Sequence, residues 1–167
     1  MRTTVIRPPR ASDEQAFLAA VDRSRELHHP WVQPPGSRAR FRKAIERWKG
    51  RSHAAFFIWH ANDLVGVVNI SEIVRGSFRS AYLGYYAFEP YARTGLMREG
   101  LAKVIGHAFT RMKLHRLEAN IQPANKKSIR LVKRLGFRRE GYSPRYLKIA
   151  GRWRDHERWT ILGEEWR

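Results

Sequence analysis

A single strand–helix–strand unit lies between segments that predict strands joined by tight turns, and this order limits the possible folds more than any other feature. The first strand of the unit spans Ser80 to Phe88, and Pro90 ends it. A helical pattern of apolar residues then runs from Gly95 to about Met112, and Arg116 to Ile121 alternates like a short strand. Because a helical crossover returns the chain in the same direction, the sequence predicts one parallel strand pair.

The segments before and after this unit predict antiparallel strands and three more helices. The expected elements are a strand Thr3–Pro8, a helix beginning near Ala11, a helix Ser37–Lys49, a hairpin of Ala54–His60 and Leu64–Glu72, a helix Lys126–Leu135, and strands Phe137–Ile149 and Trp153–Leu162. We therefore expect an α/β (α+β) fold with a mixed, mostly antiparallel sheet of about seven strands and about four helices. No change in composition divides the chain, so residues 1–167 are expected to form a single domain.

The composition excludes several classes of protein. Because it has no cysteine, the chain has no disulfide, thiolate metal site or cysteine nucleophile. The apolar runs are too short to cross a bilayer, and the first residues lack the apolar segment of a signal peptide. We expect a cytoplasmic protein that does not associate with a membrane.

The formal net charge of +18 is unusual for a metabolic enzyme. One explanation is an anionic partner, such as nucleic acid, a ribosome or a polyphosphate cofactor. The other explanation is genome bias, because arginine far outnumbers lysine. The charge is spread from Arg2 to Arg167, which favours diffuse electrostatic attraction over a dedicated nucleic-acid motif. Both explanations stay open.

Residues Arg93 to Met97 follow a strand and open a helix, which is the setting of many phosphate sites. Such a loop directs free backbone N–H groups one way, and the helix adds the positive end of its dipole. Gly95 lets a phosphate approach the backbone closely. An ordinary helix start with a glycine turn would explain the same pattern.

A second helix start follows at Asn125 to Ser128. These two residues lie one helical turn apart, so both side chains can face one point, and Asn125 can also cap the helix. Basic residues follow along this helix as far as Arg139, and most are expected on a solvated face. Two helix N-termini that face one ligand predict a cofactor that carries phosphate.

Other polar and aromatic residues indicate less. The histidines lack metal-ligand spacing, so we expect no metal site. Glu72, at a strand end, is either a general base or a charged strand terminus. Tyr146 and Trp153, on the last two strands, are expected to be packing residues.

Together, these segments resemble the GNAT family of acetyl-CoA-dependent N-acetyltransferases. The resemblance lies in the glycine-containing loop that opens a helix after a strand, followed by Asn-x-x-Ser and Gly-Phe. More narrowly, the chain is similar to the bacterial ribosomal-protein-alanine N-acetyltransferases, over most of its length from about Gly66. The segments that carry this likeness are Val74–Phe78, Tyr82–Tyr85, Gly95–Met97, His115-Arg116, Leu135–Phe137, Glu140–Tyr142 and Gly151–His156.

The resemblance implies a sheet that splays between the strand ending near Phe88 and the strand beginning near Arg116, with acetyl-CoA in the splay. Its pyrophosphate would rest on backbone N–H groups, its pantetheine would pair with a strand edge, and its thioester would lie near the second helix. The implied cofactor-binding residues are Tyr86, Ala87, Phe88, Arg93, Thr94, Gly95, Leu96, Met97, Asn125 and Ser128.

Two departures from the family pattern affect the implied site. Ala92 stands where the family has Arg or Gln, so a side-chain contact to the cofactor is missing unless Arg93 replaces it. Val132 stands where many members have a tyrosine that protonates the departing thiolate. Ser128 is then the best substitute for that acid, and Glu72 is the candidate base.

The expected reaction is direct attack of an amine on the thioester, with the N-terminal α-amine of a protein, such as an alanine-starting ribosomal protein, as the acceptor. An α-amine has a pKa near 8, so deprotonating it at neutral pH costs about 1 kcal/mol, against about 4 to 5 kcal/mol for a lysine. The alternatives are another amine (a lysine side chain, a polyamine or an antibiotic) or a ribosome- or RNA-binding factor with weak catalysis. We expect a monomer or a homodimer.

Overall fold

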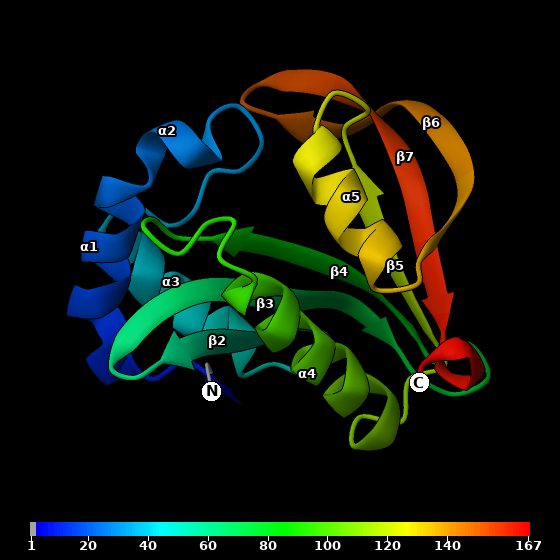
Figure 1. Cartoon of the computed structure of the whole chain (residues 1–167), viewed down its shortest axis with the longest axis horizontal. Coiled ribbons are helices and arrows are strands. Elements are labelled where there is room, and N and C mark those ends of the chain that lie inside the picture. The colour runs from blue at the N-terminus through cyan, green and yellow to red at the C-terminus, as the bar shows by residue number, and fades with distance from the viewer. Residues whose placement is uncertain (1–2) are drawn as a thin grey trace.

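The computed structural model describes residues 3–167 and contains one seven-stranded sheet in the order β1-β2-β3-β4-β5-β7-β6. Its strands are β1 (Thr4–Arg7), β2 (Ala54–His60), β3 (Asp63–Val74), β4 (Ser80–Ala87), β5 (Arg116–Ile121), β6 (Arg138–Ile149) and β7 (Arg152–Leu162). Neighbouring strands are antiparallel except β4 and β5, which are parallel. The predicted mixed sheet with one crossover is confirmed (Figure 1).

Each predicted helix is present within a few residues of its expected ends. The α-helices of residues 3–167 are α1 (Glu14–Arg23), α2 (Arg25–His28), α3 (Arg38–Trp48), α4 (Leu96–Thr110) and α5 (Lys126–Arg134). Ser37 caps α3 by accepting a hydrogen bond from the Arg40 N–H, which explains why this helix begins where the sequence predicts. Helix α2 was not predicted, because four residues are too few to show a helical period.

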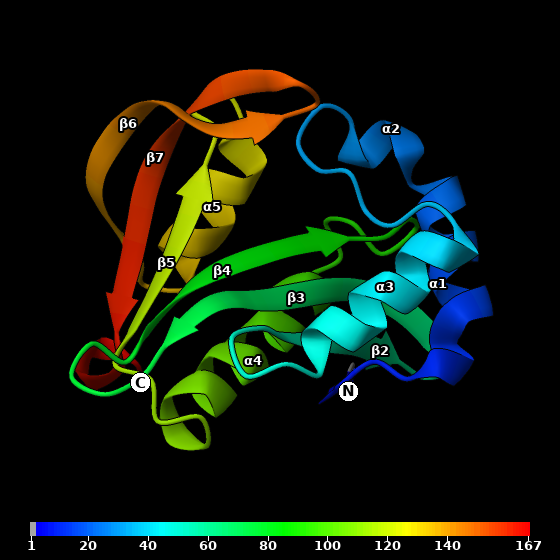
Figure 2. The same ribbon diagram turned by 180° about the vertical axis from the view of Figure 1, so that it is seen from behind.

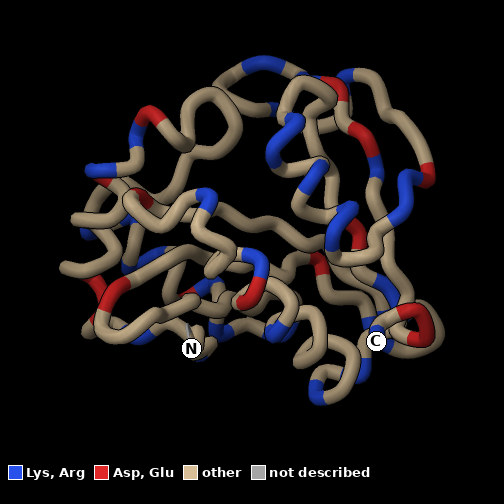
Figure 3. Tube along the Cα trace, viewed as in Figure 1, with Lys and Arg blue, Asp and Glu red and all other residues tan. Residues whose placement is uncertain are grey.

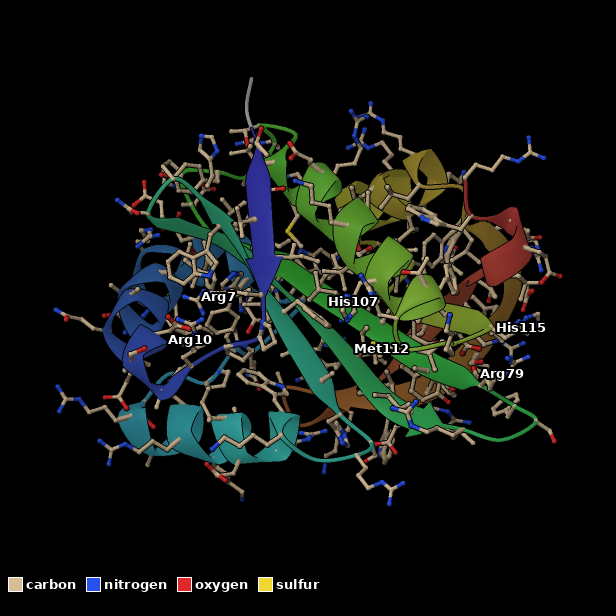
Figure 4. The ribbon with its side chains drawn as sticks, turned by 90° about the horizontal axis from the view of Figure 1, so that it is seen from below. Arg7, Arg10, Arg79, His107, Met112 and His115 are labelled. Carbon is tan, nitrogen blue, oxygen red and sulfur yellow. The ribbon has the colours of Figure 1, made fainter. Side chains whose placement is uncertain are left out.

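Helices cover both faces of the sheet, and α3 and α4 lie on opposite sides of the strands (Figure 4). On the face that we call rear, α1 and α3 enclose an aromatic core that includes Phe17, Phe41 and Phe57. On the front face, α4 and α5 cover a second core that includes Leu101 and Leu117. Seen from behind, α1 and α3 cover β2 and β3, whereas β5 and β7 lie in front of α5 (Figure 2).

The parallel pair of β4 and β5 is short. In the described chain, pairing runs from Ser80 to Tyr82, with Tyr82 opposite Glu118. Beyond this point β4 continues to Ala87 without pairing to β5, so the two strands diverge. We call the gap beyond Tyr82 and Glu118 the splay. Its position agrees with the predicted splay in the middle of the sheet.

The edge strand β1 is tied to α4 by a carboxylate. Glu99 Oε1 accepts hydrogen bonds from the Thr4 backbone N–H at 2.7 Å and from the Thr4 hydroxyl at 2.9 Å. Lys103 Nζ lies 2.9 Å from the same oxygen. The Thr4 N–H and the lysine together lower the pKa of Glu99 to about 2, so this carboxylate stays charged.

Basic residues lie on almost every element of the described chain, in line with the diffuse distribution in the sequence (Figure 3). No helix within residues 3–167 is long and apolar enough to span a bilayer. The same residues contain no group of three or more His, Cys, Asp or Glu side chains arranged to hold a metal ion.

Candidate active site

Beyond its last pair with β5, β4 presents an open backbone edge to the splay. The Phe88 N–H donates to the Val65 carbonyl of β3 at 2.8 Å. Because successive N–H groups of a strand point in opposite directions, the Ala87 N–H points away from β3 and into the splay. The Ala87 carbonyl accepts a hydrogen bond from His28 Nε2 at 2.8 Å, which holds this part of β4 in place. The Ala87 N–H can therefore donate to an oxygen that lies in the splay.

Ser128 and Tyr85 join the two walls of the splay. Ser128 lies in the first turn of α5, and Tyr85 lies on the front face of β4. The Tyr85 hydroxyl is 2.6 Å from Ser128 Oγ and also donates to the Ser128 carbonyl at 3.2 Å. Burial raises the pKa of Tyr85, so the phenol stays protonated at neutral pH. When the single phenol proton points to Ser128 Oγ, the Ser128 hydroxyl is free to donate its own proton into the splay.

Asn125 is the N-cap of α5. Its Oδ1 accepts a hydrogen bond from the Ser128 N–H at 3.2 Å, which fixes the first turn of the helix. Ile129 and Val132 turn into the front core, and Val132 is fully buried. The cap and the buried stripe together orient Ser128 towards β4.

The loop before α4 has the backbone geometry of an anion site. Arg93 and Gly95 have positive φ angles of 66° and 90°, and a Cβ on Gly95 would meet no atom within 4 Å. The backbone N–H groups of Gly95, Met97 and Arg98 have no hydrogen-bond acceptor among residues 3–167. Free N–H groups at a helix N-terminus attract phosphate. Of the five predicted phosphate-loop positions, the cavity described below is lined by Thr94, Gly95 and Leu96.

The side chains of this loop have other partners. Leu96 and Met97 are buried, at 3% and 7% exposure, so only their backbone faces the opening. The Thr94 hydroxyl donates to the Tyr91 carbonyl at 2.7 Å and accepts a hydrogen bond from the Leu96 N–H at 3.4 Å. The loop is held by its own contacts.

A cavity of about 410 Å³ lies between the N-terminus of α4 and the C-terminal end of α5. Its lining consists of Thr94, Gly95, Leu96, Arg98, Glu99, Ala102, Arg134 and Leu135. Arg98 and Arg134 bring positive charge to it from two helices, and the α4 dipole adds to that charge. The single acid of the lining, Glu99, is bonded to Thr4 and Lys103. The cavity is suited to a phosphate group.

Tyr86 and Phe88 turn their rings to the rear face, away from α4 and α5. Both pack edge-on against His28, with ring centroids 5.3 Å and 5.6 Å from the imidazole. Burial lowers the pKa of His28, so the ring is neutral at pH 7. Contact between these two residues and a ligand in the splay would therefore use their backbone.

Glu72 lies apart from the other predicted site residues. It sits at a register shift of β3 with a φ of 50°, and its side chain is 63% exposed. Its Oε1 is 3.5 Å from His53 Nε2. Val68, four residues earlier on β3, pairs with Tyr85, so Glu72 lies roughly 13 Å along the strand from the Tyr85–Ser128 contact. The structure does not bring Glu72 and Ser128 together.

Tyr85 was not predicted as a site residue. Strand alternation puts Tyr85 on the same face as Leu83, but its partner Ser128 lies 43 residues away and follows from the fold alone. Trp153 was expected to be a packing residue, but its side chain is 61% exposed near the tip of the β6–β7 hairpin. Tyr146 is half-buried, and its hydroxyl lies 3.5 Å from that of Tyr82.

Comparison with known proteins connects this geometry to a family. Residues 4–138 match the family described as acetyltransferase (GNAT) domain. The ribosomal protein uS5-alanine N-acetyltransferase of Escherichia coli is 36% identical over 157 residues, which cover 93% of this chain and 80% of that protein.

Solved structures show the same architecture. Mycobacterium smegmatis RimJ in complex with CoA-disulfide superposes with a TM-score of 0.90 at 28% identity, covering 97% of this chain and 83% of that one. Spermidine N-acetyltransferase from Vibrio cholerae, in complex with CoA and spermine, has a TM-score of 0.82 at 22% identity and covers 97% and 96%. At that lower identity the likeness concerns the fold.

Proposed function

This chain belongs to the GNAT family of acetyltransferases, and we propose that it transfers acetyl from acetyl-CoA to the N-terminal α-amine of a protein, in particular a ribosomal protein that begins with alanine. The observation that carries the proposal is the 2.6 Å contact between Ser128 and Tyr85. It puts a proton donor at the junction of the two walls, where a thioester in the splay would release its thiolate.

The residues around the splay fit acetyl-CoA. The open edge of β4 can pair with the amides of pantetheine, as a neighbouring strand would. The pyrophosphate would rest on the N–H groups of Gly95 and Met97, with Arg98 and Arg134 as counter-charges. The similar RimJ structure is in complex with CoA-disulfide, which supports CoA as the ligand of this fold.

Three groups divide the chemical work. The Ala87 N–H would stabilise the oxyanion that forms when the amine attacks, and one such donor is typically worth about 3 kcal/mol. Ser128, hydrogen-bonded to Tyr85, would protonate the departing thiolate. Glu72 was predicted as the base, but it lies about 13 Å along β3 from this contact, so we do not assign it a part in these steps.

The acceptor is proposed from similarity and charge. The E. coli relative is named for acetylation of an alanine on ribosomal protein uS5, which supports a protein α-amine. The net charge of +18 favours an encounter with ribosomal RNA or an anionic protein surface. A polyamine carries charge of the same sign as this chain, so the encounter would be disfavoured.

A panel of short peptides with different first residues, incubated with acetyl-CoA and analysed by mass spectrometry, tests the proposal. We expect acetylation at the α-amine, most rapidly on peptides that begin with alanine. Acetylation confined to lysine side chains or to spermidine would replace the proposed acceptor.

A further inference from the structure

Buried polar atoms without a hydrogen-bond partner gather on the rear face of the sheet, beside the splay. Among residues 3–167, four of the five such side-chain atoms are Asn69 Oδ1, Tyr86 OH, Asn120 Oδ1 and Arg158 Nε. Asn69 pairs with Gly84, two residues before Tyr86 on β4, so both lie on one face of one side of the splay. Asn120 pairs with Arg158 on the other side. Buried polar groups are normally satisfied, so this cluster indicates a polar ligand.

On the far side of the splay, Arg158 and Tyr146 lie against the same rear face. A Cβ at Gly141 of β6 would collide with Arg158 Nη2, so the glycine lets the guanidinium lie close to the sheet. The Tyr146 hydroxyl reaches to 3.5 Å from the hydroxyl of Tyr82, the last β4 residue that pairs with β5. The two phenols thus close the narrow end of the splay on its rear side.

His156 lies on the same face of β7 as Arg158 and has one free ring nitrogen. Its Nδ1 is 2.9 Å from the Arg154 carbonyl. A carbonyl can only accept, so Nδ1 carries the proton and Nε2 carries a lone pair. The hydrogen bond found for this ring among residues 3–167 uses Nδ1, which leaves Nε2 open to a ligand. The ring centroid lies 6.2 Å from that of Tyr146, so His156 belongs to the same rear-face cluster.

We propose that His156 Nε2 is the general base that takes a proton from the acceptor amine, while the amide oxygens of Asn69 and Asn120 and the Arg158 guanidinium bind the first peptide unit. This inference rests on the proposed function. The unpaired acceptors Asn69 Oδ1 and Asn120 Oδ1 suit the N–H donors of an α-amine. The unpaired donor Arg158 Nε suits the carbonyl of the first peptide unit. A polyamine has no acceptor for the Arg158 N–H, so the same cluster favours a peptide.

The step conserves atoms and protons. The amine nitrogen loses one proton to His156 Nε2 and forms the C–N bond to the thioester carbon. The C–S bond then breaks, and the sulfur takes a proton from the Ser128 hydroxyl. His156 returns its proton to water and Ser128 regains one from water, which leaves the acetylated peptide and CoA thiol.

The protonation state of the ring suits this role. Burial lowers the pKa of His156 below its ordinary value, against smaller opposing effects of the Arg154 carbonyl and Asp155. Other charged groups on this face are Arg116 and Glu118 on β5, Arg154 and Arg158 on β7, and Glu140 of β6, which is bonded to Arg116. Glu118 and Arg158 also act on the Tyr146 phenol beside the ring. His156 is therefore neutral at pH 7 and able to accept a proton.

The test compares His156→Asn with the wild-type enzyme on an alanine-starting peptide from pH 6.5 to 9.5. Asparagine can still donate to the Arg154 carbonyl, so the variant removes the base and keeps the local hydrogen bond. We expect kcat to fall about a hundredfold at pH 6.5. The loss should shrink to under about threefold at pH 9.5, because the α-amine is then neutral without help. The Kd for acetyl-CoA should stay within about twofold of the wild-type value, since His156 lies outside the cofactor cavity.

His115→Asn is the matched control, because His115 lies at the closed end of the sheet beside Arg79 (Figure 4). It should leave kcat and its pH dependence unchanged. An unchanged kcat in His156→Asn, or a loss of the same size at every pH, would overturn the role of His156 and leave the proposed function intact. Wild-type enzyme that binds acetyl-CoA and acetylates no α-amine would overturn both.

Discussion

The closed and the splayed parts of the β4–β5 pair are held together in different ways. In the closed part, residues 80–82 of β4 pair with residues 116–118 of β5, and Leu117 is fully buried in the apolar core. In the splayed part, side chains replace this backbone pairing: the Tyr85 phenol meets Ser128, and His28 donates to the Ala87 carbonyl. The same two strands thus give stability at one end and reactive, polar groups at the other.

This difference shows how a parallel pair can make a site. Strands that diverge leave backbone donors and acceptors unpaired, and each must find another partner. Some of the side-chain groups that border this gap are buried and still unpaired, such as Asn69 and Asn120. A ligand that inserts between the strands would satisfy groups that the fold leaves open.

The largest expected effect lies in the closed part. Leu117→Ala removes a fully buried side chain and should lower the free energy of unfolding by about 3 kcal/mol. In a chain of this length that corresponds to a fall of roughly 6–12 °C in the midpoint of thermal unfolding. Tyr85→Phe, in the splayed part, should cost about 1 kcal/mol, the value of one hydrogen bond. Equal losses in calorimetry would remove the distinction between the two parts.

Catalysis should show the reverse pattern. Ser128→Ala should lower kcat about a hundredfold, because the departing thiolate loses its acid. Its Kd for acetyl-CoA should change little, and Ser77→Ala in an exposed turn is the control. Steady-state kinetics with calorimetric titration of the cofactor separates the two quantities. If Ser128→Ala retained wild-type kcat, Ser128 would have no role as an acid.

A smaller effect is expected at the cofactor cavity. Arg98→Gln and Arg134→Gln should each weaken CoA binding by about three- to tenfold, which corresponds to roughly 1 kcal/mol for one partly exposed charge contact. The weakening should diminish at high salt, where exposed charges are screened. Lys127→Gln, on the exposed side of α5, is the matched control and should leave the Kd unchanged. Equal losses in all three variants would point to net charge as the cause.

The smallest expected effect is a pH dependence that arises beside the splay. Burial lowers the pKa of His28 in the folded chain. Below about pH 6.5, His28 is therefore protonated in the unfolded chain while it is still neutral in the folded chain. The contribution of His28 is complete above that pH and is lost as the pH falls. His28→Gln keeps a donor for the Ala87 carbonyl and cannot titrate, so its unfolding free energy should depend less on pH between 5 and 7. Identical pH profiles in urea titrations would assign the dependence to His107 and His156, whose pKa values are also lowered by burial.

Most of the fold could be predicted from local patterns. Period-two and helical spacing gave β5 at its observed bounds, Arg116–Ile121, and α5 to within one residue. Ser37 and Asn125 marked helix starts because their side chains bond the first free N–H groups. These features depend on residues a few positions apart, so the sequence displays them directly.

The site was predictable only in part, because its contacts join distant segments. The phosphate loop is local, and its free N–H groups lie at the N-terminus of α4 as expected. Tyr85 and Ser128 meet across the splay, and His156 comes within 6.2 Å of Tyr146 through a bend in β6. The spacing of residues along the sequence predicts neither the Tyr85–Ser128 contact nor the approach of His156 to Tyr146.

The hydrogen bonds between Glu99 and Thr4 join the outermost strand to the helix whose first turn borders the cofactor cavity. Glu99 now accepts hydrogen bonds from three donors, and two of them would be lost if β1 frayed. A ligand that stabilises α4 should therefore stabilise β1 as well. Binding of CoA in the cofactor cavity is therefore coupled to hydrogen exchange in the edge strand β1. The amide of Thr4 should exchange more slowly with solvent deuterium once CoA is bound, which makes the sheet edge a remote reporter of ligation.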